Sequence, residues 1–163
     1  MAVCFAAVSP ATLARLQRAP EEVERYLVPD NGMAEPPHST DVDKAWHGIH
    51  YLLTGTAWEG REPFCWAVMA QPKIGPDLGM GPARYLTAEQ VVRLTAALDS
   101  LTVDDLSARY DPQAMEALRI YPDAIWRRDG EEALQYLLDH FTHLLDFYRD
   151  AAARGDAVLQ WVC

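Results

Sequence analysis

The chain has 163 residues, of which half are hydrophobic and 23% are charged, and its formal net charge is −10. This length and composition predict one globular domain over residues 1–163 and exclude an intrinsically disordered chain. The acidity, together with the lack of clustered Lys and Arg, argues against nucleic acid as a partner, because the summed field repels phosphate groups.

The sequence also bears on the compartment. No apolar run approaches the ~20 residues that a membrane-spanning helix requires, and the first ten residues lack the basic flank of a secretory signal. We therefore expect a cytoplasmic protein that does not bind membranes. The three cysteines, Cys4, Cys65 and Cys163, show no C-x-x-C spacing, so we expect reduced thiols.

The beginning of the chain predicts a strand, two helices and a loop. Residues 2–8 are small, apolar or β-branched and predict a buried strand. Residues 9–20 start with Ser-Pro, which suits an N-cap and a first helical position, and they end at a proline. That proline restarts the chain as a second short helix over residues 21–27, and the Pro-rich residues 28–38 predict a loop.

The segment from Thr40 to Gly55 predicts an amphipathic helix. Thr40 and Asp43 have the spacing of a capping box, and Gly55 ends the helical pattern. The apolar residues between them, including Trp46, fall on one side at about 100° per residue. This helix should therefore bury that side in the core.

The middle of the chain is harder to interpret. Residues 58–82 combine a short apolar segment with a Gly/Pro loop, and the pattern does not predict their path. Residues 83–86 predict a short strand. The T-x-x-Q spacing that starts at Thr87 then predicts a helix with a capping box.

The last third of the chain is mostly helical. Short helices are expected to begin at Thr102 and at Asp111, which precedes a proline. The longest helix covers residues 131–154, has an apolar stripe at spacings of 3, 4 and 7, and is closed by Gly155. Residues 157–162 predict a final strand rich in Val, Leu and Trp.

These elements predict the α+β class. We expect a small sheet that contains the N- and C-terminal strands and the strand near residue 85, covered by six or more helices. Burial of Trp46 and Phe141, which mark the apolar sides of two helices, is part of this prediction.

Several motifs resemble one known family. They are D-V-D-K-A-W-H-G-I-H-Y-L-L-T-G at residues 41–55, G-M-G-P-A-R-Y-L-T from Gly79, Tyr121-Pro122, and V-L-Q-W in the last strand. Together they resemble the YfbM-like family of bacterial proteins of unknown function, and the likeness covers nearly the whole chain. The resemblance implies a single cytoplasmic α+β domain and no established activity.

A carboxylate and two imidazoles lie on one flank of the predicted helix at residues 40–55. Asp43, His47 and His50 have the spacing i, i+4 and i+7, which could offer three ligands to one metal ion. The alternative, which we favour, is structural, because Asp43 partners Thr40 and His50 can donate to a backbone carbonyl at the edge of the core. We therefore predict neither a metal nor a cofactor.

Two further patterns have structural alternatives. Tyr136, His140, His143 and Phe147 form a second stripe on the long helix, which is either enclosed by the domain or contacts a partner, with enclosure favoured. The loop over residues 75–82 resembles a phosphate-binding glycine loop, but it lacks a lysine and contains Asp77. Its glycines should instead adopt positive φ in an irregular turn.

One polar group remains as a candidate ligand site. Lys and Arg beside aromatic side chains can hold an anionic small molecule or a carboxylate on a protein partner, although ordinary surface ion pairs would explain them equally well. The residues of this candidate site are Lys44, His50, Thr54, Arg84 and Tyr85, with Trp126 as an aromatic wall.

The functional hypotheses follow from the absence of a recognisable catalytic motif. No G-x-S-x-G or similar nucleophile motif is present, so we predict no catalytic residues and favour a binding or interaction domain. The first alternative is a hydrolase-like enzyme that uses His50 or His47 near Asp43, with Lys44 or Arg84 holding an anion. A further alternative, supported by charge alone, is an acidic inhibitor or immunity-type protein that neutralises a basic toxin.

Overall fold

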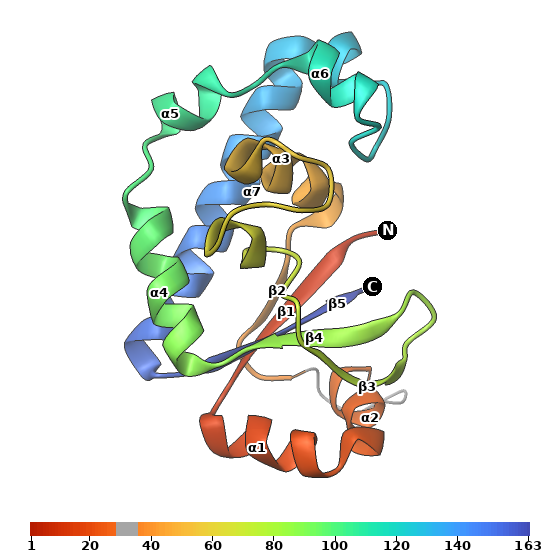
Figure 1. The fold of residues 1–163 in the computed structure, drawn as a ribbon, viewed down its shortest axis with the longest axis vertical. Helices are drawn as coiled ribbons and strands as arrows, with labels where there is room; N and C mark the ends of the chain where they lie inside the picture. Colours follow the sequence, from red (N-terminus) through yellow and green to blue (C-terminus); the bar gives the residue numbers. More distant parts are fainter. Residues whose placement is uncertain (29–35) are drawn as a thin grey trace.

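The computed structural model describes residues 1–28 and 36–163, and its centre is one antiparallel sheet (Figure 1). The strands are β1 (Val3–Val8), β2 (Ser39–Asp41), β3 (Lys73–Asp77), β4 (Pro82–Leu86) and β5 (Ala157–Val162). Their order is β2-β1-β5-β4-β3. The three predicted strands are thus the three central ones, and the α+β class is confirmed.

Helices cover both faces of this sheet (Figure 1). They are α1 (Pro10–Arg18), α2 (Val23–Leu27), α3 (Trp46–Thr54), α4 (Ala88–Asp99), α5 (Val103–Ala108), α6 (Pro112–Ala117) and α7 (Ile125–Arg154). Short 3-10 turns are η1 (Pro20–Glu22), η2 (Asp43–Ala45) and η3 (Phe64–Trp66). None of the helices in the described residues combines the length and the apolar character that crossing a lipid bilayer requires.

The pleat of the strands divides the buried side chains into two cores. In β1, Phe5 and Ala7 join the large core formed with α3, α4 and α7, whereas Ala6 and Val8 join the smaller core under α1 and α2. Such alternation is the period-2 geometry of a strand that is covered on both faces. Trp46 and Phe141 are each only 4% exposed, as predicted.

Most helix boundaries follow from capping residues that the sequence makes visible. The Ser9 hydroxyl accepts a hydrogen bond from the backbone of α1, and Thr87 and Gln90 form the predicted capping box of α4. Each such cap is worth about 1 kcal/mol. Gly55 and Gly155 adopt positive φ at the ends of α3 and α7, where a residue without Cβ is least strained.

The predicted cap at Thr40 is wrong. Thr40 lies in β2, opposite Phe5 of β1, and its hydroxyl is hydrogen-bonded to His143 Nε2 at 2.5 Å. The amide of Asp43 donates instead to the carboxylate of Asp41. Strand pairing with β1 thus competes successfully with helix capping, and helical backbone begins only at η2.

Other boundaries also differ from the prediction. The interval 58–82, whose path was not predicted, contains η3 and the edge strand β3. Helix α7 begins at Ile125 and passes through a non-helical Gly130, so the predicted helix over 131–154 corresponds to its regular part. Residues 29–35 of the predicted loop lie outside the described residues.

The expectation of reduced thiols is wrong for two of the three cysteines. Cys4 and Cys163 form a disulfide whose Cα atoms are 6.1 Å apart. The cause is the antiparallel pairing of β1 with β5, which places Cys4 opposite Trp161 and the backbone of Cys163 against Ala2. Cys65 is a free, buried cysteine, and burial raises the pKa of its thiol.

Candidate functional site

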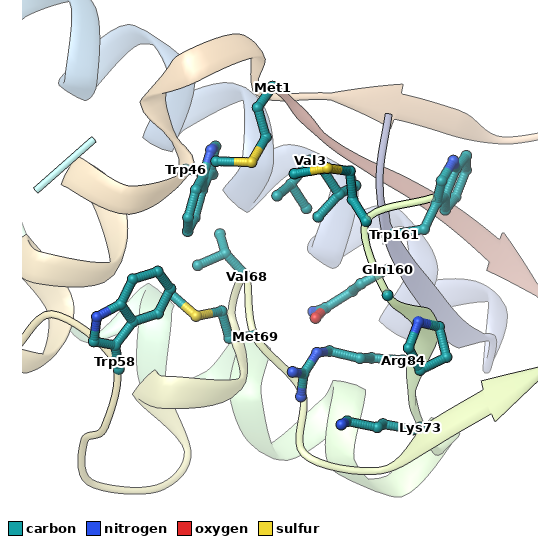
Figure 2. A pocket seen from close by; sticks show the side chains of 14 residues that line it. Met1, Val3, Trp46, Trp58, Val68, Met69, Lys73, Arg84, Gln160 and Trp161 are labelled. Atoms are coloured by element: carbon teal, nitrogen blue, oxygen red, sulfur yellow. The ribbon is translucent and has the colours of Figure 1, made fainter. Parts of the chain in front are cut away.

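A cavity of about 270 Å³ lies at the end of the sheet where β1 and β4 begin and β5 ends (Figure 2). Its size is close to the lower end of ordinary ligand pockets, which run from about 300 to 1,000 Å³. Aromatic, thioether and aliphatic side chains supply most of its wall, and two cations lie on the side formed by β3 and β4. The site is therefore mainly apolar with a charged edge.

Two tryptophans define the apolar side of the cavity. Trp46 is buried at the start of α3, and Trp58 is 62% exposed on the segment that follows this helix. Their ring centroids are 6.2 Å apart, and the imidazole of His47 lies within 5 Å of both rings. Figure 2 shows Met69 reaching the same side beside Trp58.

His47 and His50 hold the segment that carries Trp58. The His47 Nε2–H donates to Ala57 O at 2.7 Å, and its Nδ1 accepts from the Tyr121 amide at 2.9 Å, which requires a neutral ring with the proton on Nε2. His50 Nε2–H donates to Glu59 O at 2.9 Å. The two imidazoles thus bind the backbone on both sides of Trp58.

Burial keeps both rings neutral. It lowers the pKa of His47, and it lowers the pKa of His50 to about 4, because a buried imidazolium would lose its hydration. Asp43 does not join them, since its carboxylate accepts from the Tyr136 hydroxyl at 3.0 Å. In the ranges 1–28 and 36–163, no three His, Cys, Asp or Glu residues gather as metal ligands.

The charged edge of the cavity consists of Lys73 and Arg84, which are directly opposite each other in the β3–β4 pair. The half-buried Arg84 donates from Nη1 to Ala70 O at 2.7 Å. Figure 2 shows both side chains extending in the same direction, toward the side of the cavity that carries Trp58. Neither forms an ion pair with a carboxylate of the described residues.

Gln160, which is 1% exposed, connects the sheet to the wall of the cavity. Its Oε1 accepts from the Ala70 amide at 2.7 Å, and its Nε2 donates to Trp66 O at 2.8 Å and to the Tyr148 hydroxyl at 2.9 Å. The Tyr148 hydroxyl in turn donates to Ala67 O at 2.7 Å. The segment over residues 66–70, which includes Met69, is thereby fixed to β5 and α7.

The structure does not bring the six predicted site residues together around one pocket. Arg84 alone among them lines the cavity described above. Lys44 lines a different, more open depression beside Asp129 and Tyr136. Tyr85 follows Arg84 on the strand, so it faces the opposite side of the sheet and packs against the small core.

The other three predicted residues have structural contacts. His50 is fully buried, and the Thr54 hydroxyl donates to the His50 carbonyl one turn earlier in α3. Trp126 is fully buried and donates from Nε1 to Ile120 O. For the hydrolase-like alternative, His50 lies in the core and Lys44 at the surface, so these two expected residues do not share one site.

Sequence reasoning missed most of the residues that form the cavity. Trp58, Met69 and Lys73 all lie in the interval whose path was not predicted. Gln160 could have been noticed, because it is the one polar residue in an otherwise apolar strand and occurs in the V-L-Q-W motif. A buried amide in such a strand needs partners, which here come from the cavity wall.

The two other patterns are also explained. Tyr136 and His143 contact Asp43 and Thr40, and Phe147 packs 5.9 Å from Phe5, so the domain covers the second stripe of α7 only in part: Tyr136, His140 and Phe147 are half-buried, and His143 is exposed.

In the glycine loop, the Asp77 carboxylate accepts from the amides of Gly79 and Gly81, both at 2.8 Å. Both glycines have positive φ, as predicted. The loop's own carboxylate thus occupies the place that a bound phosphate would need.

Comparison with known proteins gives a family and a fold. The domain of unknown function DUF1877 matches the chain over residues 1–161. Among solved structures, the chain is similar to YfbM from Escherichia coli, a protein of unknown function, with a TM-score of 0.74 and 21% identity over 98% of each chain. No curated protein matches.

Proposed function

We propose, from the premise that this chain belongs to the DUF1877 family of unknown function, that it is a small-molecule-binding domain whose site is the cavity beside Trp46 and Trp58. The observation that carries the proposal is the gathering of exposed apolar side chains at one opening. Of the seven large hydrophobic side chains that are exposed in the described residues, Met1, Trp58 and Met80 all line this cavity. Scattered exposed apolar residues are normal, whereas a gathered set around a hollow is typical of a binding site.

A second observation supports the same site. The indole Nε1 of Trp46 is buried and has no hydrogen-bond partner among the described residues, although buried polar groups are nearly always paired. Figure 2 shows this ring on the cavity wall, next to the side chain of Met1. A ligand that displaces Met1 could supply the missing acceptor.

The polar groups of the cavity favour binding over catalysis. Lys73 and Arg84 are cations, and both ends of the Gln160 amide are already hydrogen-bonded. A general base needs an unprotonated group with a free lone pair near the operating pH, and none of these three side chains offers one.

The test is a binding screen with a matched pair of variants. Isothermal titration calorimetry would measure binding of a panel of small aromatic and branched aliphatic compounds to the wild-type chain. Trp58→Ala should weaken binding of any hit by about tenfold or more, since truncating a tryptophan that anchors a binding site typically costs about 2 kcal/mol. Leu118→Ala, which truncates an exposed apolar residue outside the lining of the cavity, should have no effect.

Two results would contradict the proposal. One is that no compound of the panel binds. The other is that compounds bind equally well to the wild type and to Trp58→Ala, which would place their site elsewhere on the molecule.

A further inference from the structure

We propose that the ligand of this cavity is a small monocarboxylate, with its carboxylate between Lys73 and Arg84 and its apolar body against Trp46 and Trp58. This inference rests on the proposed function, because it names the chemical class that the same cavity accepts. It follows from the placement of the two cations, the state of the guanidinium, and the arrangement of the apolar wall.

The charges of the two cations are not matched by any carboxylate of the described residues. Lys73 and Arg84 are directly opposite each other across two antiparallel strands, and like charges in that position destabilise the pair. The chain has 24 acidic and 14 basic residues, so carboxylates are in surplus. Six other arginines form ion pairs with carboxylates, yet this pair has none among the described residues.

The guanidinium of Arg84 is prepared to bind a planar anion. One of its N–H groups donates to Ala70 O, which fixes the orientation of the group. A guanidinium has five N–H donors, so most of them remain for a carboxylate, which it binds through two parallel hydrogen bonds. Arg84 is half-buried, and this partial loss of water strengthens such a bond.

Lys73 supplies the second charge from the rim. Its side chain is exposed, and its ammonium acts as a point charge that adds attraction without demanding a fixed geometry. The two cations together exceed the single negative charge of one carboxylate. The net charge of −10 opposes any further negative charge on the ligand. A monocarboxylate therefore fits the site better than a phosphate ester.

The apolar wall sets where the rest of the ligand lies. Figure 2 shows Trp46, Trp58 and Met69 on the side away from the strands that carry the cations, and Gln160 beside Arg84. A molecule with a charged head and a short aromatic or branched aliphatic body matches this division. The cavity volume of about 270 Å³ limits the body to a small one.

The experiment compares three probes that share one body. Calorimetric titration of the wild-type chain with 3-phenylpropionate, 3-phenylpropionamide and 3-phenylpropylamine keeps the phenyl body and changes the head group from an anion to a neutral amide to a cation. The carboxylate should bind at least about tenfold more tightly than the neutral amide, because hydrogen bonds to charged groups are stronger than neutral ones. The amine should bind more weakly than either.

Variants then locate the effect. Lys73→Gln and Arg84→Gln should each weaken binding of the carboxylate by about tenfold and leave binding of the amide unchanged. Lys44→Gln, which alters the only other lysine of the chain, is the matched control and should bind all three probes like the wild type. Lys73 is exposed, so its variant should fold normally even if Arg84→Gln does not.

The outcomes separate the two proposals. If carboxylate and amide bind with equal affinity, or if Lys73→Gln and Lys44→Gln behave alike, the inference about the carboxylate is overturned while the binding function stands. The inference is also overturned if none of the three probes binds but neutral compounds of the wider panel do. If nothing in either experiment binds, the proposed function itself fails.

Discussion

Replacing His50 by Gln should remove a large part of the acid sensitivity of this protein. The His50 ring is fully buried, its Nε2–H holds Glu59 O, and its Nδ1 has no hydrogen-bond partner in the described residues. Burial lowers the pKa of His50 from 6.5 to about 4. The unfolded chain therefore binds more protons than the folded chain between these two pH values, and stability falls as the pH falls.

The size of the effect follows from the two pKa values. At pH 7.5 the imidazole is neutral in both states, so His50 contributes no pH dependence. At pH 5 it is protonated in nearly all unfolded molecules but in few folded ones, which lowers the free energy of unfolding by about 2 kcal/mol. The loss continues until the pH approaches 4, where the folded state also takes up the proton.

Urea denaturation at pH 7.5 and pH 5 would measure this difference. The wild type should lose about 2 kcal/mol more than His50→Gln, whose amide can still donate to Glu59 O but does not titrate. Thr54→Val, which removes a neighbouring hydroxyl and leaves the imidazole, is the control for general destabilisation and should keep the pH dependence of the wild type. Equal losses in the wild type and His50→Gln would refute the reasoning.

Three further predictions concern stability. Gly48→Ala should destabilise the protein by about 1 to 3 kcal/mol in urea denaturation. A Cβ at this position would lie 2.5 Å from Leu137 Cδ2 in the packed contact between α3 and α7. An unchanged midpoint would show that this contact can relax. Gln160→Leu should cost about 3 kcal/mol or more, since it leaves several buried partners unpaired, and a loss under 1 kcal/mol would contradict the role given to this amide. The disulfide between Cys4 and Cys163 closes a separation of 159 residues, so replacing both cysteines by Ser should lower the free energy of unfolding by up to about 5 kcal/mol, by the chain-entropy estimate. The wild type in reductant should lose the same amount. No loss in either case would exclude the bond in solution.

The parts of the fold that the sequence predicts are those determined by neighbours along the chain. Apolar runs at residues 2–8 and 157–162 are strands because both of their faces are buried, and Thr87 begins a helix because its own next turn supplies the partner. The edge strands were missed for the opposite reason. β2 has three residues, and β3 contains Gly75 and Pro76, so each depends on its pairing partner for its conformation.

The candidate site was predicted only in part, again because several of its residues depend on partners outside their own segment. Arg84 was found because it stands in a recognisable strand. His50 was given two interpretations, and the structural one, donation to a backbone carbonyl, is confirmed at Glu59 O. Trp58 and Lys73 could not be joined to Arg84, because the route between them follows no periodic pattern and is fixed by side-chain contacts: His47 holds Ala57, ten residues away, and Gln160 holds Ala70, 90 residues away.

These side-chain contacts have a common chemical form, and it bears on how the cavity can work. His47, His50 and Gln160 are buried polar side chains, and each is hydrogen-bonded to the backbone of an irregular segment that lines the cavity or flanks it. A loop held in this way loses its conformational entropy when the protein folds, so a ligand does not have to order it on binding. Buried amide and imidazole groups thus set the wall, whereas the β3–β4 register places the two cations and the Ala70 carbonyl, in the segment held by Gln160, orients Arg84. Substitutions of His47 or His50, which do not line the cavity, should accordingly weaken binding of charged and neutral ligands alike, whereas substitutions of Lys73 or Arg84 should change the preference for charge.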